Sequence, residues 1–133
     1  MTAASIRRGS CLCGQVRFSV GGKLRPVSYC HCTQCRKTHG HFAAYTNADE
    51  SQLQLHEQTT LGWYDSSQFA RRGFCRHCGA SLFWQRIGSG TISIAAGCLE
   101  VPTGLRGDRH IFCNDASDYY QIADGLPVFP QAD

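Results

Sequence analysis

The chain has 133 residues, which is enough for one hydrophobic core and too few for two, so we expect a single domain spanning residues 1–133. Hydrophobic residues make up 42% of the chain and charged residues 17%, a composition that excludes intrinsic disorder. The formal net charge of +3 is too small for a dedicated nucleic-acid binder, and no apolar segment is long enough for a membrane span or a secretory signal. We therefore expect a cytoplasmic protein with neither nucleic acid nor a membrane as its partner.

Short strands separated by turns are predicted along most of the chain. Glycine and proline, Gly62 and Gly73 among them, interrupt the sequence about every ten to twenty residues, which leaves no room for long helices. Apolar residues alternate in residues 15–20 and place Val16 and Phe18 on one face of a strand. Further strands are predicted at residues 42–46, 53–55, 81–86 and 91–96, and one helical turn at residues 33–39. The pattern predicts a mainly β fold of antiparallel sheets with short helical turns.

Nine cysteines are the outstanding feature of the composition, and seven of them fall into three groups. The spacings are C-x-C, C-x-C-x-x-C and C-x-x-C-G, which are typical of metal ligands. The odd number of cysteines and the lack of an export signal argue against a disulfide scaffold. The groups are Cys11 with Cys13, Cys30 with Cys32 and Cys35, and Cys75 with Cys78.

The first and third groups together provide four thiolates, the complete tetrahedral ligand set of a structural zinc. Cys11 and Cys13 point to the same face of an extended strand, because side chains two residues apart lie on one side. Cys75 and Cys78 are typical of a zinc knuckle, in which Gly79 permits the turn. Since 61 residues lie between Cys13 and Cys75, such a metal would join distant strands and contribute to folding.

Three arginines near the third group, Arg71, Arg72 and Arg76, are candidates to offset the negative charge of four thiolates around one dication. The alternative is that these arginines form a solvent-exposed strand edge.

The middle group, Cys30, Cys32 and Cys35, has no fourth cysteine nearby. Three protein ligands are typical of catalytic zinc, which keeps its fourth position for water or substrate. His31 lies between two candidate ligands and points away from the metal in an extended segment, so we expect it to pack or to support a ligand.

Two isolated cysteines, Cys98 and Cys113, leave an alternative open for this middle group. Either of them closes the site as a fourth ligand, or both are buried as small apolar side chains.

Four motifs in the chain occur at residues 9–14 (GSCLCG), 30–37 (CHCTQCRK), 72–79 (RGFCRHCG) and 124–127 (DGLP). In this order they resemble the glutathione-dependent formaldehyde-activating enzyme family. The resemblance implies a β-tent fold stapled by a structural zinc on the first and third cysteine groups. It also implies a catalytic zinc on the middle group, and hence two zinc ions per chain. The implied reaction is of the carbon–sulfur lyase type and joins a small thiol, glutathione, to an aldehyde, formaldehyde, to give S-(hydroxymethyl)glutathione.

Such a reaction needs protein groups beyond the metal ligands. An acid is needed for the alkoxide that forms on the aldehyde oxygen. Four histidines are candidates for that acid: His31, His39, His41 and His110. Arg36 and Lys37 follow Cys35 and are candidates to bind a carboxylate of the thiol substrate, the alternative being an exposed helical turn.

Two other classes of function are alternatives to an enzyme. The β-tent fold implied by the resemblance is shared with chaperones and protein partners, so the first alternative is a zinc-stabilised binding module without turnover. The second is a redox protein that forms a disulfide within residues 30–35, which is disfavoured because a C-x-C disulfide is strained.

Overall fold

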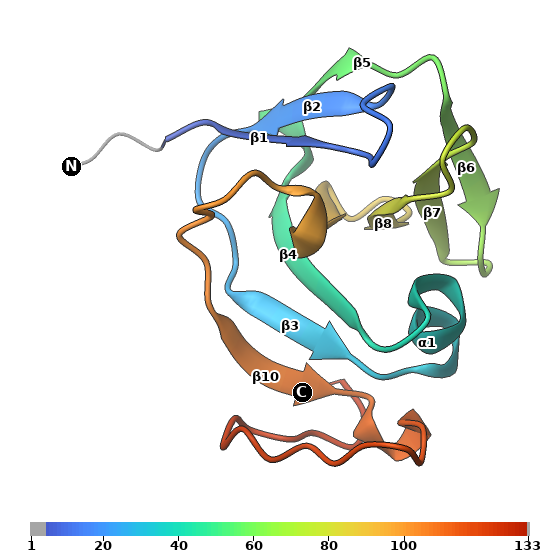
Figure 1. The fold of residues 1–133 in the computed structure, drawn as a ribbon, viewed down its shortest axis with the longest axis vertical. Helices are drawn as coiled ribbons and strands as arrows, with labels where there is room; N and C mark the ends of the chain where they lie inside the picture. Colours follow the sequence, from blue (N-terminus) through green and yellow to red (C-terminus); the bar gives the residue numbers. More distant parts are fainter. Residues whose placement is uncertain (1–4, 133) are drawn as a thin grey trace.

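The computed structural model describes residues 5–132, in which short strands predominate (Figure 1). The ends of the predicted domain, residues 1–4 and 133, lie outside the described residues. Among residues 5–132, no helix is long and apolar enough to cross a membrane. The elements are β1 (Arg7–Ser10), β2 (Arg17–Val20), β3 (Val27–Cys30), α1 (Thr33–His39), β4 (Ala43–Asp49), η1 (Glu50–Gln52), β5 (Leu53–Glu57), β6 (Leu61–Asp65), β7 (Ala70–Cys75), β8 (Ser81–Arg86), β9 (Thr91–Ala95), η2 (Ala96–Cys98), β10 (Gly107–Ile111) and η3 (Cys113–Asp115).

Two sheets make up the fold. The larger sheet has the strand order β10-β3-β4-β9-β8-β7-β6, and the smaller has the order β1-β2-β5. All neighbouring pairs are antiparallel except β10 and β3, which run parallel. The predicted mainly β fold with short helices is confirmed, and the predicted helix has the bounds of α1. The parallel pair was not predicted, because β10 has the sequence GDRHI and lacks apolar alternation.

The main hydrophobic core lies between the two sheets. Val16, Phe18 and Val20, from β2 and the residue before it, are at most 1% exposed. The Phe18 ring meets the ring of Phe83 in β8 edge to face, with centroids 5.2 Å apart. Burial of such large apolar side chains is the dominant favourable contribution to folding. The apolar face predicted for residues 15–20 is confirmed.

Two glycines that the sequence analysis interpreted as breaks lie inside strands, Gly62 in β6 and Gly73 in β7. A Cβ atom on Gly73 would lie 3.0 Å from ring atoms of both Phe83 and Trp63. Gly73 therefore makes room for aromatic rings, and the interpretation as a turn was wrong for these two positions.

The opposite face of the larger sheet positions the candidate site. Side chains at paired positions on neighbouring strands share a face, and the register pairs Arg72 with Trp84, Trp84 with Ser93, and Ser93 with Asn47. Tyr45 lies on the same face, two residues from Asn47 along β4. This face carries polar side chains beside its aromatic ones, whereas the core face carries apolar side chains such as Phe83 and Ile94.

Helix α1 and the C-terminal segment border this face. Ser81 at the start of β8 donates a hydrogen bond from its hydroxyl to the carbonyl of Thr38 in α1 (3.1 Å). The C-terminal segment runs beside β10, where the N–H of His110 donates to the carbonyl of Pro127 and that of Phe129 to the carbonyl of His110, both at 2.9 Å (Figure 1).

Candidate functional site

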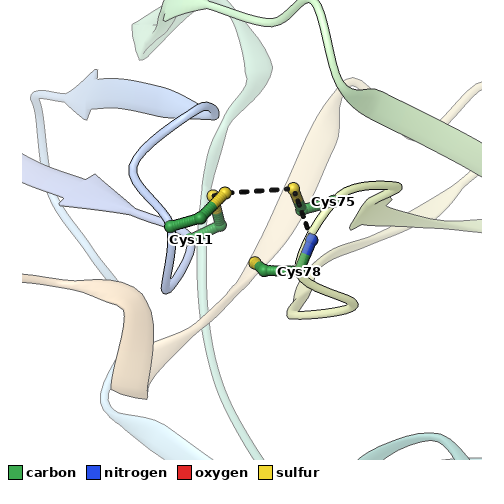
Figure 2. A group of neighbouring side chains, drawn as sticks. Cys11, Cys75 and Cys78 are labelled. Carbon is green, nitrogen blue, oxygen red and sulfur yellow. Dashed lines mark hydrogen bonds between the residues drawn. The ribbon is translucent and has the colours of Figure 1, made fainter.

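The first and third cysteine groups meet in space. Cys11 and Cys13 lie on the loop between β1 and β2, whereas Cys75 and Cys78 lie at the end of β7 and in the following turn (Figure 2). The four sulfur atoms all lie within 4.8 Å of one another. Cys13 Sγ is 3.8 Å from Cys75 Sγ and 3.6 Å from Cys11 Sγ. We call these four residues the four-cysteine cluster.

Hydrogen bonds around Cys75 suit a thiolate. The N–H of Cys78 donates to Cys75 Sγ at 3.4 Å (Figure 2). The N–H of His77 donates to the same sulfur at 3.4 Å, and the Thr60 hydroxyl lies 3.2 Å from it. Burial by itself raises the pKa of the Cys75 thiol, but these hydrogen bonds outweigh it and lower the pKa to about 6. The Cys75 thiol is therefore mostly deprotonated at neutral pH.

The arginines expected beside this cluster have other partners. Arg71 lies over the Trp63 ring, 3.8 Å from its centroid, and Arg76 donates from Nη2 to the carbonyl of Thr59 (2.9 Å). Arg72 contacts the other cysteine group. The expectation that these side chains offset the charge of four thiolates was therefore wrong for Arg72, and Arg71 and Arg76 show no hydrogen bond to these sulfurs within residues 5–132.

The middle group also comes together, and we call it the three-cysteine cluster. Cys30 ends β3, Cys32 precedes α1 and Cys35 lies in its first turn, with their sulfur atoms all within 4.8 Å of one another. The N–H of Cys35 donates to Cys32 Sγ (3.3 Å), and Arg72 donates from Nη2 to Cys35 Sγ (3.7 Å). Hydrogen bonds from the neighbouring cysteine thiols, the Cys35 N–H and the charge of Arg72 lower the pKa of Cys32.

Both clusters fit zinc by their donor atoms and spacing. Tetrahedral coordination with Zn–S bonds near 2.3 Å requires sulfur atoms about 3.8 Å apart, close to the 3.6 and 3.8 Å measured between the sulfurs of Cys11, Cys13 and Cys75. Among the described residues, neither Cys98 nor Cys113 joins the three-cysteine cluster, and Cys98 Sγ instead donates to the carbonyl of Ser81 (3.4 Å). The four-cysteine cluster therefore matches the predicted set of four ligands, and the three-cysteine cluster matches the predicted set of three with a free fourth position.

His31 is buried and points away from the sulfurs of the three-cysteine cluster, into a series of hydrogen bonds that ends at the exposed Asp124. Its Nδ1 pairs with the Tyr120 hydroxyl, and its Nε2 lies 2.8 Å from His110 Nδ1. The Nε2 atom of His110 in turn lies 2.8 Å from Asp124 Oδ2. Burial, assisted by the nearby His110, lowers the pKa of His31 to about 4, so this ring is neutral at pH 7. These hydrogen bonds connect the segment between Cys30 and Cys32 to the C-terminal part of the protein.

A cavity of about 460 Å³ opens beside the three-cysteine cluster, on the polar face of the larger sheet. All three cysteines line it, together with three arginines, Arg25, Arg72 and Arg86. Neither Arg36 nor Lys37, the predicted contacts to a substrate carboxylate, is among the lining residues. Arg36 donates instead from Nε to the carbonyl of Asp115 (3.1 Å).

The four candidate histidines do not line this cavity either, but Tyr45 does. The Tyr45 hydroxyl is hydrogen-bonded to His39 Nε2 (2.9 Å) and accepts from Arg72 Nη1 (3.4 Å). Burial raises the pKa of Tyr45, so its phenol stays protonated, and burial together with Arg72 lowers the pKa of His39. His39 therefore reaches the cavity only through Tyr45.

Tyr45 is a functional candidate that sequence reasoning missed, and Arg72 is a candidate that it assigned to the other cysteine group. Arg72 is only 7% exposed, and its Nε atom has no hydrogen-bond partner within residues 5–132. A buried guanidinium is costly unless negative charge lies nearby, and Cys35 Sγ beside Arg72 would carry such charge as a metal ligand. No local motif marks Tyr45, and the motif that begins with Arg72 does not show that its side chain contacts Cys35, because that contact joins two different elements.

Comparison with known proteins identifies the family. Residues 6–115 match the family model described as glutathione-dependent formaldehyde-activating enzyme. The chain belongs to this family. The match includes every cysteine of both clusters.

Relatives of the chain agree with membership of the formaldehyde-activating family. A Schizosaccharomyces pombe protein named as an uncharacterized lyase is 28% identical over 123 residues, which cover 91% of this chain and 88% of that protein. A Halomonas elongata protein named "Putative glutathione-dependent formaldehyde-activating enzyme" is 34% identical over 84 residues, or 57% of this chain and 53% of that protein. A Rhodobacter sphaeroides crystal structure aligns with a TM-score of 0.60 at 27% identity, covering 75% of this chain and 97% of that one.

Proposed function

We propose that this protein joins a small thiol such as glutathione to an aldehyde such as formaldehyde, in a carbon–sulfur lyase reaction that runs in the synthetic direction. The observation that carries the proposal is the three-cysteine cluster, which has no fourth cysteine among its described neighbours and borders a cavity. The family and the names of its relatives support the same chemistry. We place the reaction in the cytoplasm, where thiols stay reduced.

Zinc is the metal that we propose for both clusters. Cys11, Cys13, Cys75 and Cys78 would hold a structural ion, and Cys30, Cys32 and Cys35 would hold a catalytic one. When bound at the three-cysteine cluster, zinc lowers the pKa of a thiol in its open position and so supplies a sulfur nucleophile at neutral pH.

The bond changes of the proposed reaction are simple. The thiol sulfur attacks the carbonyl carbon, a C–S bond forms, and the electron pair of the C=O π bond moves onto oxygen. The oxygen then takes up one proton, which balances the proton that the thiol loses. The protein must therefore stabilise negative charge on that oxygen.

Arg72 and Tyr45 are placed to meet this need. A guanidinium has only donors, so Arg72 donates to the Tyr45 oxygen, and the phenol keeps its own proton for His39 or for an aldehyde oxygen. Arg72 also sits beside Cys35 Sγ and compensates the negative charge that three thiolates and a bound thiolate leave around a dication. In this proposal Tyr45 donates to the developing oxyanion and Arg72 holds both partners in position.

Metal substitution and equilibrium exchange test the proposal. In protein loaded with cobalt at the three-cysteine cluster, glutathione should produce a new sulfur-to-metal charge-transfer band, and Cys35→Ala should abolish that band. Exchange spectroscopy at equilibrium should show faster interconversion of free and hydroxymethylated glutathione with the zinc-loaded protein than with Cys35→Ala. Cys113→Ala, which changes a cysteine outside both clusters, is the matched control and should behave as wild type.

Two results would contradict the proposal. A band without faster exchange would show a thiol-binding site with no turnover of this substrate. A protein with neither a band nor an enhancement would favour the zinc-stabilised binding module.

A further inference from the structure

Two arginines in the cavity have no part in the proposed chemistry. Arg25 lies just before β3, and Arg86 ends β8. Both side chains are exposed, and both line the cavity that also holds the three-cysteine cluster. Their positive charge in the cavity indicates which chemical group the substrate carries apart from its thiol.

Both arginines lie at the end of the sheet face remote from the cysteines. The chain runs from Arg25 along β3 to Cys30, a separation of five residues or roughly 16 Å in extended chain. β8 runs antiparallel to β7 and β9, and it starts at Ser81 beside helix α1 and the cysteines. Arg86, at the far end of β8, therefore lies toward the same end as Arg25.

Within the described part of the chain, no carboxylate forms an ion pair with either of these side chains. Burial and the charge of Arg109 lower the pKa of Arg25, and the carboxylate of Asp108 only partly opposes them. Arg25 donates only to backbone carbonyls, from Nη2 to Tyr45 (3.0 Å) and from Nε to Pro26 (3.3 Å). The Arg86 guanidinium lies over the Phe69 ring, 5.6 Å from its centroid.

The acidic residue among the described cavity lining, Asp115, lies at the other end. Asp115 belongs to η3, which follows β10, and the last residue of β10, Ile111, pairs with Cys30. The cavity therefore has the cysteines and Asp115 at one end and, at the other, two guanidinium groups that form no ion pair among the described residues.

We infer that Arg25 and Arg86 bind a carboxylate of the thiol substrate and make the site selective for small thiols that carry one. The thiol of glutathione belongs to its middle residue, so a terminal carboxylate extends roughly 7 Å from the sulfur, and an arginine side chain that reaches toward the cysteines covers the remaining distance. Guanidinium groups are well suited to carboxylates because they offer paired donors in a planar array. This inference rests on the proposed function, since it assumes that the substrate thiol binds at the three-cysteine cluster. The role of binding a substrate carboxylate, which the sequence predicted for Arg36 and Lys37, is thereby assigned to Arg25 and Arg86, which line the cavity.

Calorimetric titration of the zinc-loaded protein tests the inference with two thiols. Glutathione carries carboxylates, and 2-mercaptoethanol carries none. Arg25→Gln and Arg86→Gln should each weaken glutathione binding about five- to tenfold, the loss expected for one charge-assisted hydrogen bond at a partly exposed site, and should leave 2-mercaptoethanol binding within about twofold. The double variant should bind glutathione only as tightly as the wild-type protein binds glutathione whose carboxyl groups are esterified. The control is Arg106→Gln, an exposed arginine that does not line the cavity, which should leave both thiols unchanged.

The outcomes separate this inference from the proposed function. If both thiols bind and all arginine variants bind glutathione like wild type, the carboxylate site is wrong while the thiol site stands. If Arg106→Gln weakens glutathione as much as the cavity variants, the effect is one of net charge and the inference is overturned. If neither thiol binds the wild-type protein, the proposed function itself fails.

Discussion

The two cysteine clusters have similar donor atoms but different surroundings. The four-cysteine cluster joins the loop between β1 and β2 of the smaller sheet to the turn after β7 of the larger one, and Cys13 lies 62 positions from Cys75. The three-cysteine cluster lies within one short stretch of chain, from the end of β3 to the first turn of α1, and it borders the cavity. A metal in the first connects distant parts of the fold, whereas a metal in the second connects residues that the chain already holds together.

The polar groups beside the sulfurs also differ between the two clusters. Backbone N–H groups and the Thr60 hydroxyl surround Cys75, and they can hold a thiolate but offer nothing to a substrate. Arg72 and Tyr45 accompany Cys35, and both also face the cavity. We infer that the number of cysteines decides which cluster can take part in a reaction, and that the neighbouring side chains decide which substrate it can accept.

The largest expected effect is loss of the fold, and it should follow damage to only one cluster. Cys78→Ser removes one of the four sulfurs proposed to bind a metal between the two sheets. Since metal binding at such a site contributes directly to folding, we expect this variant to unfold or aggregate. Cys32→Ser should keep a cooperative thermal transition and lose only the metal beside the cavity. Circular dichroism melting with zinc analysis measures both. Equal loss of structure in the two variants would remove the distinction between the clusters.

Metal removal should separate the clusters without any mutation. We expect reduced protein with two zinc ions per chain, and a chelator should release them in two phases, with the metal at the three-cysteine cluster leaving first because the cavity gives access to it. The thermal transition should survive the first phase and disappear with the second. Release in a single phase, or mass spectrometry showing native disulfides, would contradict this order.

The smallest expected effect is a loss of kcat/KM when a side chain that contacts the three-cysteine cluster is changed. Two adjacent arginines, Arg72 and Arg71, allow this to be tested. Arg72→Gln removes a buried hydrogen bond to Cys35 and should lower kcat/KM ten- to about a hundredfold, as expected for the loss of one charge-assisted hydrogen bond. Arg71→Gln removes a contact with Trp63 outside the cavity and should change kcat/KM less than about twofold. Zinc content should stay the same in both variants. Similar kinetics in the two would mean that Arg72 has only a structural role.

Local spacing and periodicity account for what could be predicted from the sequence. The sulfurs of Cys11 and Cys13, like those within the middle group, are close because they are separated by one or two residues, so their spacing alone indicates metal ligands. The buried face of residues 15–20 and the helix at residues 33–39 follow from patterns within a few residues in the same way. The family could be predicted for the same reason, since its motifs are runs of consecutive residues.

Only the tertiary structure decided which side chains surround the three-cysteine cluster. Arg72 reaches Cys35 across 37 positions of the chain, and His31 reaches Tyr120 across 89. Arg36 follows Cys35 directly and yet lies outside the cavity, because the helix carries its side chain to the carbonyl of Asp115. Strand pairing, which depends on the register of distant segments, places these side chains. The sequence by itself therefore determined the cysteine groups and the family, whereas the folded sheets decided the electrostatic environment of those cysteines.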